Sequence, residues 1–411
     1  MTRTHFTIDQ ARLWQTHMDM ARHGATPGGG SDRPALSTQD ANARALLLRW
    51  CQPLGLHTHR DGIGNLFLRR PGAANTPAIA FGSHLDTVPT GGRFDGVFGV
   101  LAGLEVMRAL QGVSLPVPLE LVVWTNEEGS RFPPAMMGSR VHAGTMRLEQ
   151  ALMVEDDEGM TVAEALAESH QLGLARPGPR DWSAWIEPHI EQGPLLEAEE
   201  LVIGIVTHTV QARYFHVHLD GAPSHVGPTT MDRRQDTLAA AAEVILAAER
   251  VGLAGEPGGR SSAAWIRNEP NVRGAVPSHT RLHMDVRHED PARAAAMEAE
   301  LLAEVRAIAT RRRVTATVDA YATFGPVQFD TALGALLRAR ATARGLPTRD
   351  VVAAAGHDSV LVAPLCPSAM LFVPSRGGIT HNPAEYTAPE HLAAGAQVLL
   401  DAVVELAGGV G

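Results

Sequence analysis

Residues 82–96 read GSHLDTVPTGGRFDG, and the apolar run AIAF at 78–81 stands directly before them. A short run that is apolar on both faces is typical of a strand buried in a parallel sheet. We therefore expect a strand that delivers His84 and Asp86 at its end, and a glycine-rich turn before Asp95. Ligand sites of open α/β sheets lie beyond the ends of such strands, so these three residues are candidates for a site.

The segment that follows repeats this pattern. Its sequence predicts a helix over 97–110 and a second buried strand over 119–124, which leads to Glu127 and Glu128. Strand, helix and strand in this order predict a partly parallel α/β sheet. Neighbouring side chains alternate in direction at a strand end. One carboxylate could therefore bind a metal while the other serves as a general base toward water.

Imidazole and carboxylate groups together suit zinc and related divalent metals. Asp86 is placed to hydrogen-bond the His84 ring, which would orient an imidazole that binds metal. His189 follows a further apolar run, and the polar residues around it favour a site. His381 lies in a glycine-rich loop after a predicted strand at 370–373, where a ligand and a structural role are about equally favoured.

The sequence changes character near residue 208. The predicted order of elements over 208–323 is strand, helix, strand, strand, helix, strand, which indicates an inserted α+β domain of the ferredoxin-like type. Residues 1–207 and 324–411 would form the main α/β domain. His225 and Arg287 lie in the insert, where such residues are usually a surface histidine and a salt-bridge partner.

Composition limits the classes of partner. The chain has 411 residues, 45% of them hydrophobic, which is enough for two domains with sizeable cores. Its net charge of −10 argues against nucleic acid or an anionic membrane as the partner. Two cysteines, no apolar signal core and no run of transmembrane length make the cytoplasm the expected compartment.

The combined motifs resemble the amidohydrolase branch of the dinuclear zinc aminoacylase–carboxypeptidase family. Within it, the chain is similar to N-carbamoyl-L-amino-acid hydrolases, β-ureidopropionases and allantoate amidohydrolases. The resemblance covers almost the whole chain, and six segments carry it: Gly82-Ser83-His84-Leu85-Asp86-Thr87-Val88, Gly91-Gly92-Arg93-Phe94-Asp95-Gly96, Thr125-Asn126-Glu127-Glu128-Gly129-Ser130-Arg131-Phe132, His189-Ile190-Glu191-Gln192-Gly193-Pro194, Gly356-His357-Asp358 and His381-Asn382-Pro383.

The resemblance implies a mixed-sheet catalytic domain that holds two divalent metal ions, zinc or else manganese, cobalt or nickel. His84, Asp95 and His189 would hold one ion. Asp95, Glu128 and His381 would hold the other, so that Asp95 bridges the two.

The remaining roles are also implied by the resemblance. Glu127 would be the general base, and Asp86 would orient His84. The inserted domain would form a homodimer interface, across which His225 would stabilise the oxyanion in the other subunit's site. Four residues would contact the substrate, with the arginine gripping its carboxylate: Gln192, Arg287, Asn271 and Gly378.

The expected reaction is hydrolysis of a linear amide or ureido bond in a small substrate. An N-carbamoyl-L-amino acid is the first choice, giving the amino acid, carbon dioxide and ammonia; allantoate, β-ureidopropionate and N-acyl amino acids are alternatives. A non-catalytic binding protein on the same fold is the alternative of another class, but a decayed enzyme should have lost a ligand. Gly274 replaces an asparagine of the family pattern and Ser278 a glycine, which leaves substrate recognition open.

Overall fold

The structure is a computed structural model that describes residues 6–408. The chain divides into two compact units. The first unit comprises the residues up to Thr207 and those from Gln328 onward, and the second comprises His208–Val327. The second unit thus begins where the sequence places the insert and ends slightly beyond the expected residue 323.

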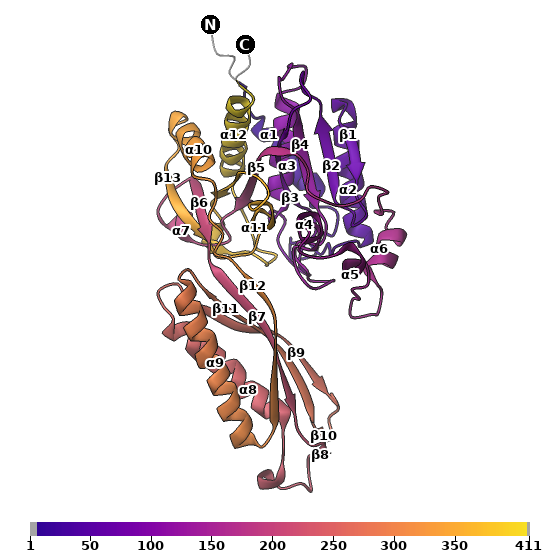
Figure 1. The fold of residues 1–411 in the computed structure, drawn as a ribbon, viewed down its shortest axis with the longest axis vertical. Helices are drawn as coiled ribbons and strands as arrows, with labels where there is room; N and C mark the ends of the chain where they lie inside the picture. The colour runs from indigo at the N-terminus through magenta and orange to yellow at the C-terminus, as the bar shows by residue number, and fades with distance from the viewer. Residues whose placement is uncertain (1–5, 409–411) are drawn as a thin grey trace. The chain divides into compact units, whose positions relative to one another are not determined.

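The first unit is built on an eight-stranded mixed sheet, coloured from indigo to yellow in Figure 1. The central pairs β4–β3, β3–β5 and β5–β14 are parallel, whereas β1–β2, β2–β4 and β6–β14 are antiparallel. The strands, in their order across the sheet, are β1 (His57–Arg60), β2 (Leu66–Arg70), β4 (Leu119–Trp124), β3 (Ala78–His84), β5 (Trp182–Ile190), β14 (Ser368–Val373), β6 (Ile203–Thr209) and β13 (Thr348–Ala353).

Both faces of the central strands are buried, as their apolar runs predict. Along β3, Ile79 and Phe81 face the main core, while Ala78 and Ala80 belong to a separate tryptophan-rich cluster. Among the described residues, ten α-helices accompany the sheet: α1 (Gln10–Met20), α2 (Thr38–Cys51), α3 (Val97–Ala109), α4 (Met137–Ala143), α5 (Leu148–Leu152), α6 (Val162–Glu168), α7 (Leu195–Ala198), α10 (Thr331–Ala343), α11 (Ser359–Val362) and α12 (Pro389–Leu406). The expected mixed α/β fold is confirmed.

Helix α3 is the principal support of the site because it begins in the loop that carries Asp95. Every residue from Val97 to Met107 is buried, as expected for a helix that is almost entirely apolar. Helix α2 begins after the N-cap residue Ser37, whose side chain accepts a hydrogen bond from Asp40 N at 3.2 Å.

The second unit is a four-stranded antiparallel sheet in the order β12-β7-β11-β9. In chain order this is 4-1-3-2, the arrangement of a ferredoxin-like fold. One face packs on two helices through alternating residues such as Phe215, Val217 and Met284. The elements are β7 (Gln211–Asp220), β8 (Ser224–His225), α8 (Thr237–Ala254), β9 (Arg260–Glu269), β10 (Ala275–Val276), β11 (His279–His288), α9 (Pro291–Arg312) and β12 (Thr315–Phe324).

Among residues 6–408, no helix is both long enough and apolar enough to cross a bilayer.

Candidate metal centre

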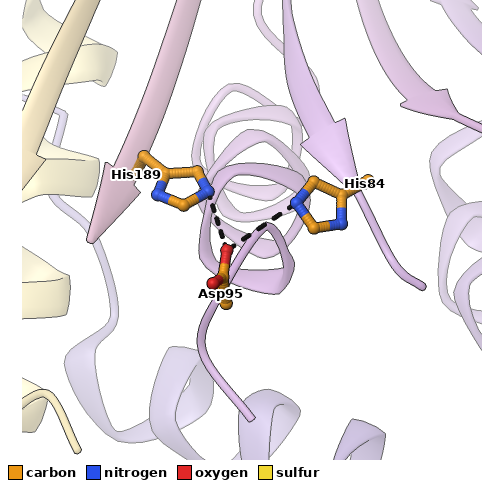
Figure 2. A group of neighbouring side chains, drawn as sticks. All are labelled: His84, Asp95 and His189. Carbon is orange, nitrogen blue, oxygen red and sulfur yellow. Dashed lines mark ion pairs between the residues drawn. The ribbon is translucent and has the colours of Figure 1, made fainter. Parts of the chain in front are cut away.

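The carboxyl ends of parallel strands bring the candidate ligands together in the first unit. His84 is the last residue of β3, and His189 is the last but one of β5. Asp95 lies in the loop between β3 and α3, and Figure 2 shows its carboxylate between the two imidazoles. Glu128 follows β4 and His381 follows β14. This is the edge at which open α/β sheets place their ligands.

Asp95 is common to two groups of potential ligands. Its Oδ1 lies 3.1 Å from Nε2 of His189 and 3.8 Å from Nε2 of His84. Its Oδ2 lies 3.3 Å from Nε2 of His381, which is also 3.3 Å from Oε2 of Glu128. Within each group the candidate ligand atoms lie within 4.8 Å of one another. The structure thus assembles the two predicted triads, with Asp95 shared between them.

The imidazoles of the first triad have the tautomer that metal binding requires. Nδ1 of His84 lies 2.9 Å from the carbonyl oxygen of Asp86, and Nδ1 of His189 lies 2.9 Å from that of Ile190. A carbonyl oxygen can only accept, so each Nδ1 must carry the proton. Nε2 is therefore the ring nitrogen that faces Asp95 and is left to bind a metal ion.

The charges of the site are unbalanced without a cation. Burial, and next the charge of Asp95, raise the pKa of Glu128 to about 8. Burial also raises the pKa of Glu127 well above its usual range, and Asp358 is the largest of the charges that add to this. Oε1 of Glu128 is buried and has no hydrogen-bond partner among the described residues. Divalent cations would supply the missing charge and partner, so the residues fit a metal centre.

The pKa values of His189 and His381 reflect the same excess of negative charge. Burial is the largest single effect on His189 and lowers its pKa, but the hydrogen bond to Asp95 and the charges of Asp95 and Glu187 together outweigh burial and raise the pKa to about 9. The hydrogen bond to Asp95 likewise raises the pKa of His381 to about 9. In the absence of metal, protons therefore take the place of cations between imidazole and carboxylate. Metal binding here would release protons.

Asp86 does not act as the sequence predicts. Its carboxylate lies 3.9 Å from Nδ1 of His84, beyond hydrogen-bond distance, because the Asp86 carbonyl occupies that position. The carboxylate instead accepts hydrogen bonds from the main-chain N–H groups of Glu127 (3.3 Å) and Glu128 (3.2 Å). The side chain of Asp86 thus holds the turn that carries the two glutamates.

The expected alternation of Glu127 and Glu128 at a strand end is not what the structure shows. Strand β4 ends at Trp124, and Asn126 has a left-handed backbone with φ of 55°. A turn, rather than strand alternation, therefore separates the carboxylates of Glu127 and Glu128. Oε2 of Glu127 lies 3.6 Å from Nε2 of His84, which places a carboxylate beside the first triad without making it part of either triad.

Several neighbours of the site were not assigned a role from the sequence. Thr380 and Glu385 surround Asp95 through hydrogen bonds of 2.8–3.2 Å. Asp358 is fully buried and accepts a hydrogen bond from the hydroxyl group of Ser139. A sequence signal existed for these acids, since Glu385 follows His381 by four residues and Asp358 stands in the quoted segment Gly356-His357-Asp358.

Two predicted substrate contacts lie in the first unit. Gln192 has a left-handed backbone (φ 59°), and its side-chain amide donates to Oδ2 of Asp95 at 2.7 Å. Gly378 has φ of 66°, and a Cβ there would lie 2.7 Å from the nitrogen of Pro194. The loops of Gln192 and Gly378 are therefore packed directly together beside the two triads.

The other predicted substrate residues lie in the second unit. His225 is exposed in β8 and pairs with Ala275, so its loop runs beside Gly274. Asn271 is exposed as well. Arg287 donates from Nε to both carboxylate oxygens of Asp285, at 3.0 and 2.9 Å, which holds its guanidinium group in one orientation.

Residues 80–405 match the peptidase family M20/M25/M40. The chain belongs to this family. This M20 family chain is 38% identical to an N-carbamoyl-L-amino-acid amidohydrolase of Rhizobium meliloti, over 97% of each chain. It is 34% identical to the allantoate amidohydrolase of Bacillus subtilis, over 94% of this chain and 95% of the relative.

A solved structure agrees with these relatives. The crystal structure of an amidase of the hydantoinase/carbamoylase family from Burkholderia vietnamiensis matches the M20 family chain with a TM-score of 0.95 and 42% identity, over 98% of both chains. The predicted resemblance is confirmed, and so is the enzyme class, a hydrolase acting on carbon–nitrogen bonds other than peptide bonds.

Proposed function

We propose that this enzyme hydrolyses an N-carbamoyl-L-amino acid to the amino acid, carbon dioxide and ammonia, at a centre of two divalent metal ions. The observation that carries the proposal is the position of Asp95, whose two oxygens face two different groups of ligand atoms. A shared carboxylate between two such groups is the arrangement that a dinuclear site needs.

In this proposal, His84, Asp95 and His189 hold one ion, while Asp95, Glu128 and His381 hold the other. Zinc, manganese, cobalt and nickel all suit this set of imidazoles and carboxylates. When bound, the two ions activate water as a nucleophile and polarise the scissile carbonyl group. The imidazole of His381 is 48% exposed, so the second group lies on the side that water and substrate can reach.

Glu127 is the proposed general base. It lies beside the first triad, directly precedes Glu128 of the second triad in the chain, belongs to neither, and is 7% exposed. Its carboxylate would take the proton of the attacking water and pass it to the leaving nitrogen. Asp86 supports this role by holding the main chain of Glu127 and Glu128, and its carbonyl group orients His84.

The second unit is proposed to form a homodimer interface. Strand β9 is at the edge of its sheet, and an open edge is a natural pairing surface. Helix α8 exposes Leu246 (54%) and Leu253 (69%), large apolar side chains that a partner would cover. Replacing Leu246 and Leu253 with glutamate should yield monomers in light scattering, and a dimer that persists would count against this interface.

The substrate contacts are assigned to both units. Gln192 and Gly378 are proposed to contact the substrate from the first unit. Arg287 and Asn271 would receive the substrate carboxylate, and His225 would stabilise the oxyanion in the site of a second copy of the chain. The support for Arg287 is its guanidinium group, which Asp285 holds in one orientation.

Allantoate and β-ureidopropionate are the alternatives within the ureido class, and N-acyl amino acids lie outside it. The allantoate amidohydrolase among the relatives supports the first of these. Gly274, which replaces the expected asparagine, keeps the choice open because loss of a donor from a polar pocket can shift specificity strongly. A non-catalytic binding protein would have no need of Glu127 together with both complete triads.

The cytoplasm is the proposed compartment. Cys51 and Cys366 are both free and buried, which suits a reducing environment. Fractionation of cells tests this, and recovery of the protein outside the cytoplasmic fraction would refute it.

The decisive experiment is ammonia release by metal-loaded protein from matched carbamoyl and acyl amino acids, allantoate and β-ureidopropionate. Release from a carbamoyl amino acid, without cleavage of its acyl partner, is the expected result. Preference for allantoate or β-ureidopropionate would identify that alternative. Cleavage of acyl compounds alone would identify the enzyme as an aminoacylase. Absence of turnover with every compound would support the alternative of a non-catalytic binding protein.

A further inference from the structure

Glu385 is a buried carboxylate that holds the main chain of a proposed metal ligand. It is 1% exposed, and its Oε1 accepts hydrogen bonds from Phe94 N at 2.8 Å and Asp95 N at 3.2 Å. Glu385 belongs to neither group of potential ligands. It therefore determines where Asp95 lies without being a ligand itself.

The other oxygen of Glu385 contacts Thr380, in the loop that carries both Glu385 and His381. Its Oε2 lies 3.0 Å from Oγ1 of Thr380, and the same hydroxyl lies 3.0 Å from Oδ2 of Asp95. Thr380 directly precedes His381, and Oδ2 is the Asp95 oxygen that faces His381. One carboxylate thus connects the loop of the shared ligand with the loop that supplies a ligand to the second ion only.

Gly92 provides the space that Glu385 occupies. A Cβ at this position would lie 1.9 Å from Cδ of Glu385 and 2.0 Å from its Oε1, so any larger residue would displace the carboxylate. Gly92 does not have a left-handed backbone, and the turn alone does not demand glycine there. The sequence alone predicts only a turn for this glycine-rich stretch. The structure adds a second reason for glycine at position 92, which is the space that the Glu385 carboxylate needs.

We infer that Glu385, acting through Thr380 and the main chain of 94–95, is a positioning residue that sets the affinity of the centre for its second metal ion. The inference rests on the proposed function. One physical effect supports it: hydrogen bonds to Glu385 and Thr380 hold Asp95 in place before metal arrives. Outer partners of this kind typically change metal affinity 10- to 100-fold.

The test is calorimetric titration of chelator-treated, metal-free protein with Zn²⁺, repeated with Mn²⁺. The variants are Glu385→Gln, Thr380→Val and Thr380→Ser. The matched control is Glu197→Gln, because Glu197 accepts a hydrogen bond from Gly377 N in the same loop but is exposed and is not a partner of Asp95. Circular dichroism of the metal-free proteins monitors folding.

We expect wild-type protein to bind two ions and Glu385→Gln to bind the second roughly 10- to 100-fold more weakly. Thr380→Val should weaken the same step, whereas Thr380→Ser and Glu197→Gln should bind as wild type does. Wild-type affinity in Glu385→Gln, or equal weakening in Glu197→Gln, would overturn the inference. If Glu385→Gln does not fold, equal affinities of the Val and Ser variants at 380 would overturn it.

The same titration separates this inference from the proposed function. Fewer than two ions bound by wild-type protein would overturn the dinuclear proposal, and this inference with it. Two ions bound by wild type and by every variant with equal affinity would overturn the role of Glu385 alone.

Discussion

The main-chain carbonyl of Asp86, not its carboxylate, accepts the hydrogen bond of His84 Nδ1, at 2.9 Å. The carboxylate is directed at the main chain of Glu127 and Glu128. Orientation of the first imidazole therefore comes from the backbone of the loop, which a side-chain substitution does not remove. The Asp86 side chain instead stabilises the turn that carries Glu127 and Glu128.

Replacement of Asp86 by asparagine tests this division. The amide can accept from only one of the two main-chain N–H groups, so the turn of Glu127 and Glu128 should shift. We expect the first ion to bind normally, the second to bind more weakly, and kcat to fall roughly 10- to 100-fold. Metal titration and steady-state kinetics measure both effects.

Asp61→Asn is the matched control for this substitution. Asp61 is also buried, and its Oδ1 accepts hydrogen bonds from the main chain of Ile63 (3.1 Å) and Asn65 (2.9 Å), in another turn. It should lower stability without changing metal binding. Selective loss of the first ion in Asp86→Asn would show instead that the Asp86 carboxylate orients His84.

Glu127→Gln should separate catalysis from metal binding. The amide has the shape of the carboxylate but cannot take a proton from water, and a positioned general base typically contributes about 10²- to 10⁴-fold. We expect kcat to fall by that factor while two ions remain bound, measured by elemental analysis. Near-normal turnover would refute the assignment, and Glu128→Gln serves as the contrasting variant, expected to lose the second ion.

Gly96→Ala should block the first triad sterically. Gly96 has φ of 66°, and a Cβ there would lie 2.2 Å from Nε2 of His84, the proposed ligand atom. We expect this variant to lose the first ion, as seen by titration. Gly144→Ala is the control because Gly144 also has positive φ, 75°, but open space around its Cβ position. Equal metal binding by both alanine variants would contradict the prediction.

The stability of metal-free protein should depend on His142. Its ring lies 5.0 Å from those of Trp124 and Trp182, and burial, with the charge of Arg180 adding, lowers its pKa to about 4. The unfolded chain, with a histidine pKa of about 6.5, binds a proton that the folded chain excludes. This stability is therefore present above pH 6.5 and lost as the pH falls toward 4.

Urea unfolding from pH 7 to 4 in the presence of chelator measures this effect. The shift corresponds to about 3 kcal/mol lost by pH 4. His142→Phe keeps an aromatic ring without a titrating group, so its unfolding free energy should decline less with acid by about that amount. Parallel pH curves for wild type and His142→Phe would refute the prediction.

Sequence patterns were sufficient for the elements that carry the ligands. Buried strands such as β3 are short apolar runs, and α3 is an apolar helix, so both can be recognised locally. Strands β6 and β13 were not predicted. Strand β13 reads TRDVVA and is at the edge of its sheet, where polar residues and partial exposure remove the apolar signal.

The two triads could be anticipated because each ligand stands in a short motif that the chain preserves. The surroundings of the triads could not, because they depend on contacts between distant loops. Glu385 and Phe94 are 291 residues apart, and no local pattern relates them. Nor could a pattern show whether the carbonyl or the carboxylate of Asp86 would meet His84, since that depends on the path of the loop after β3. Residue types and spacing specified which groups bind; only the packing of loops in three dimensions specified which atoms hold those groups in place.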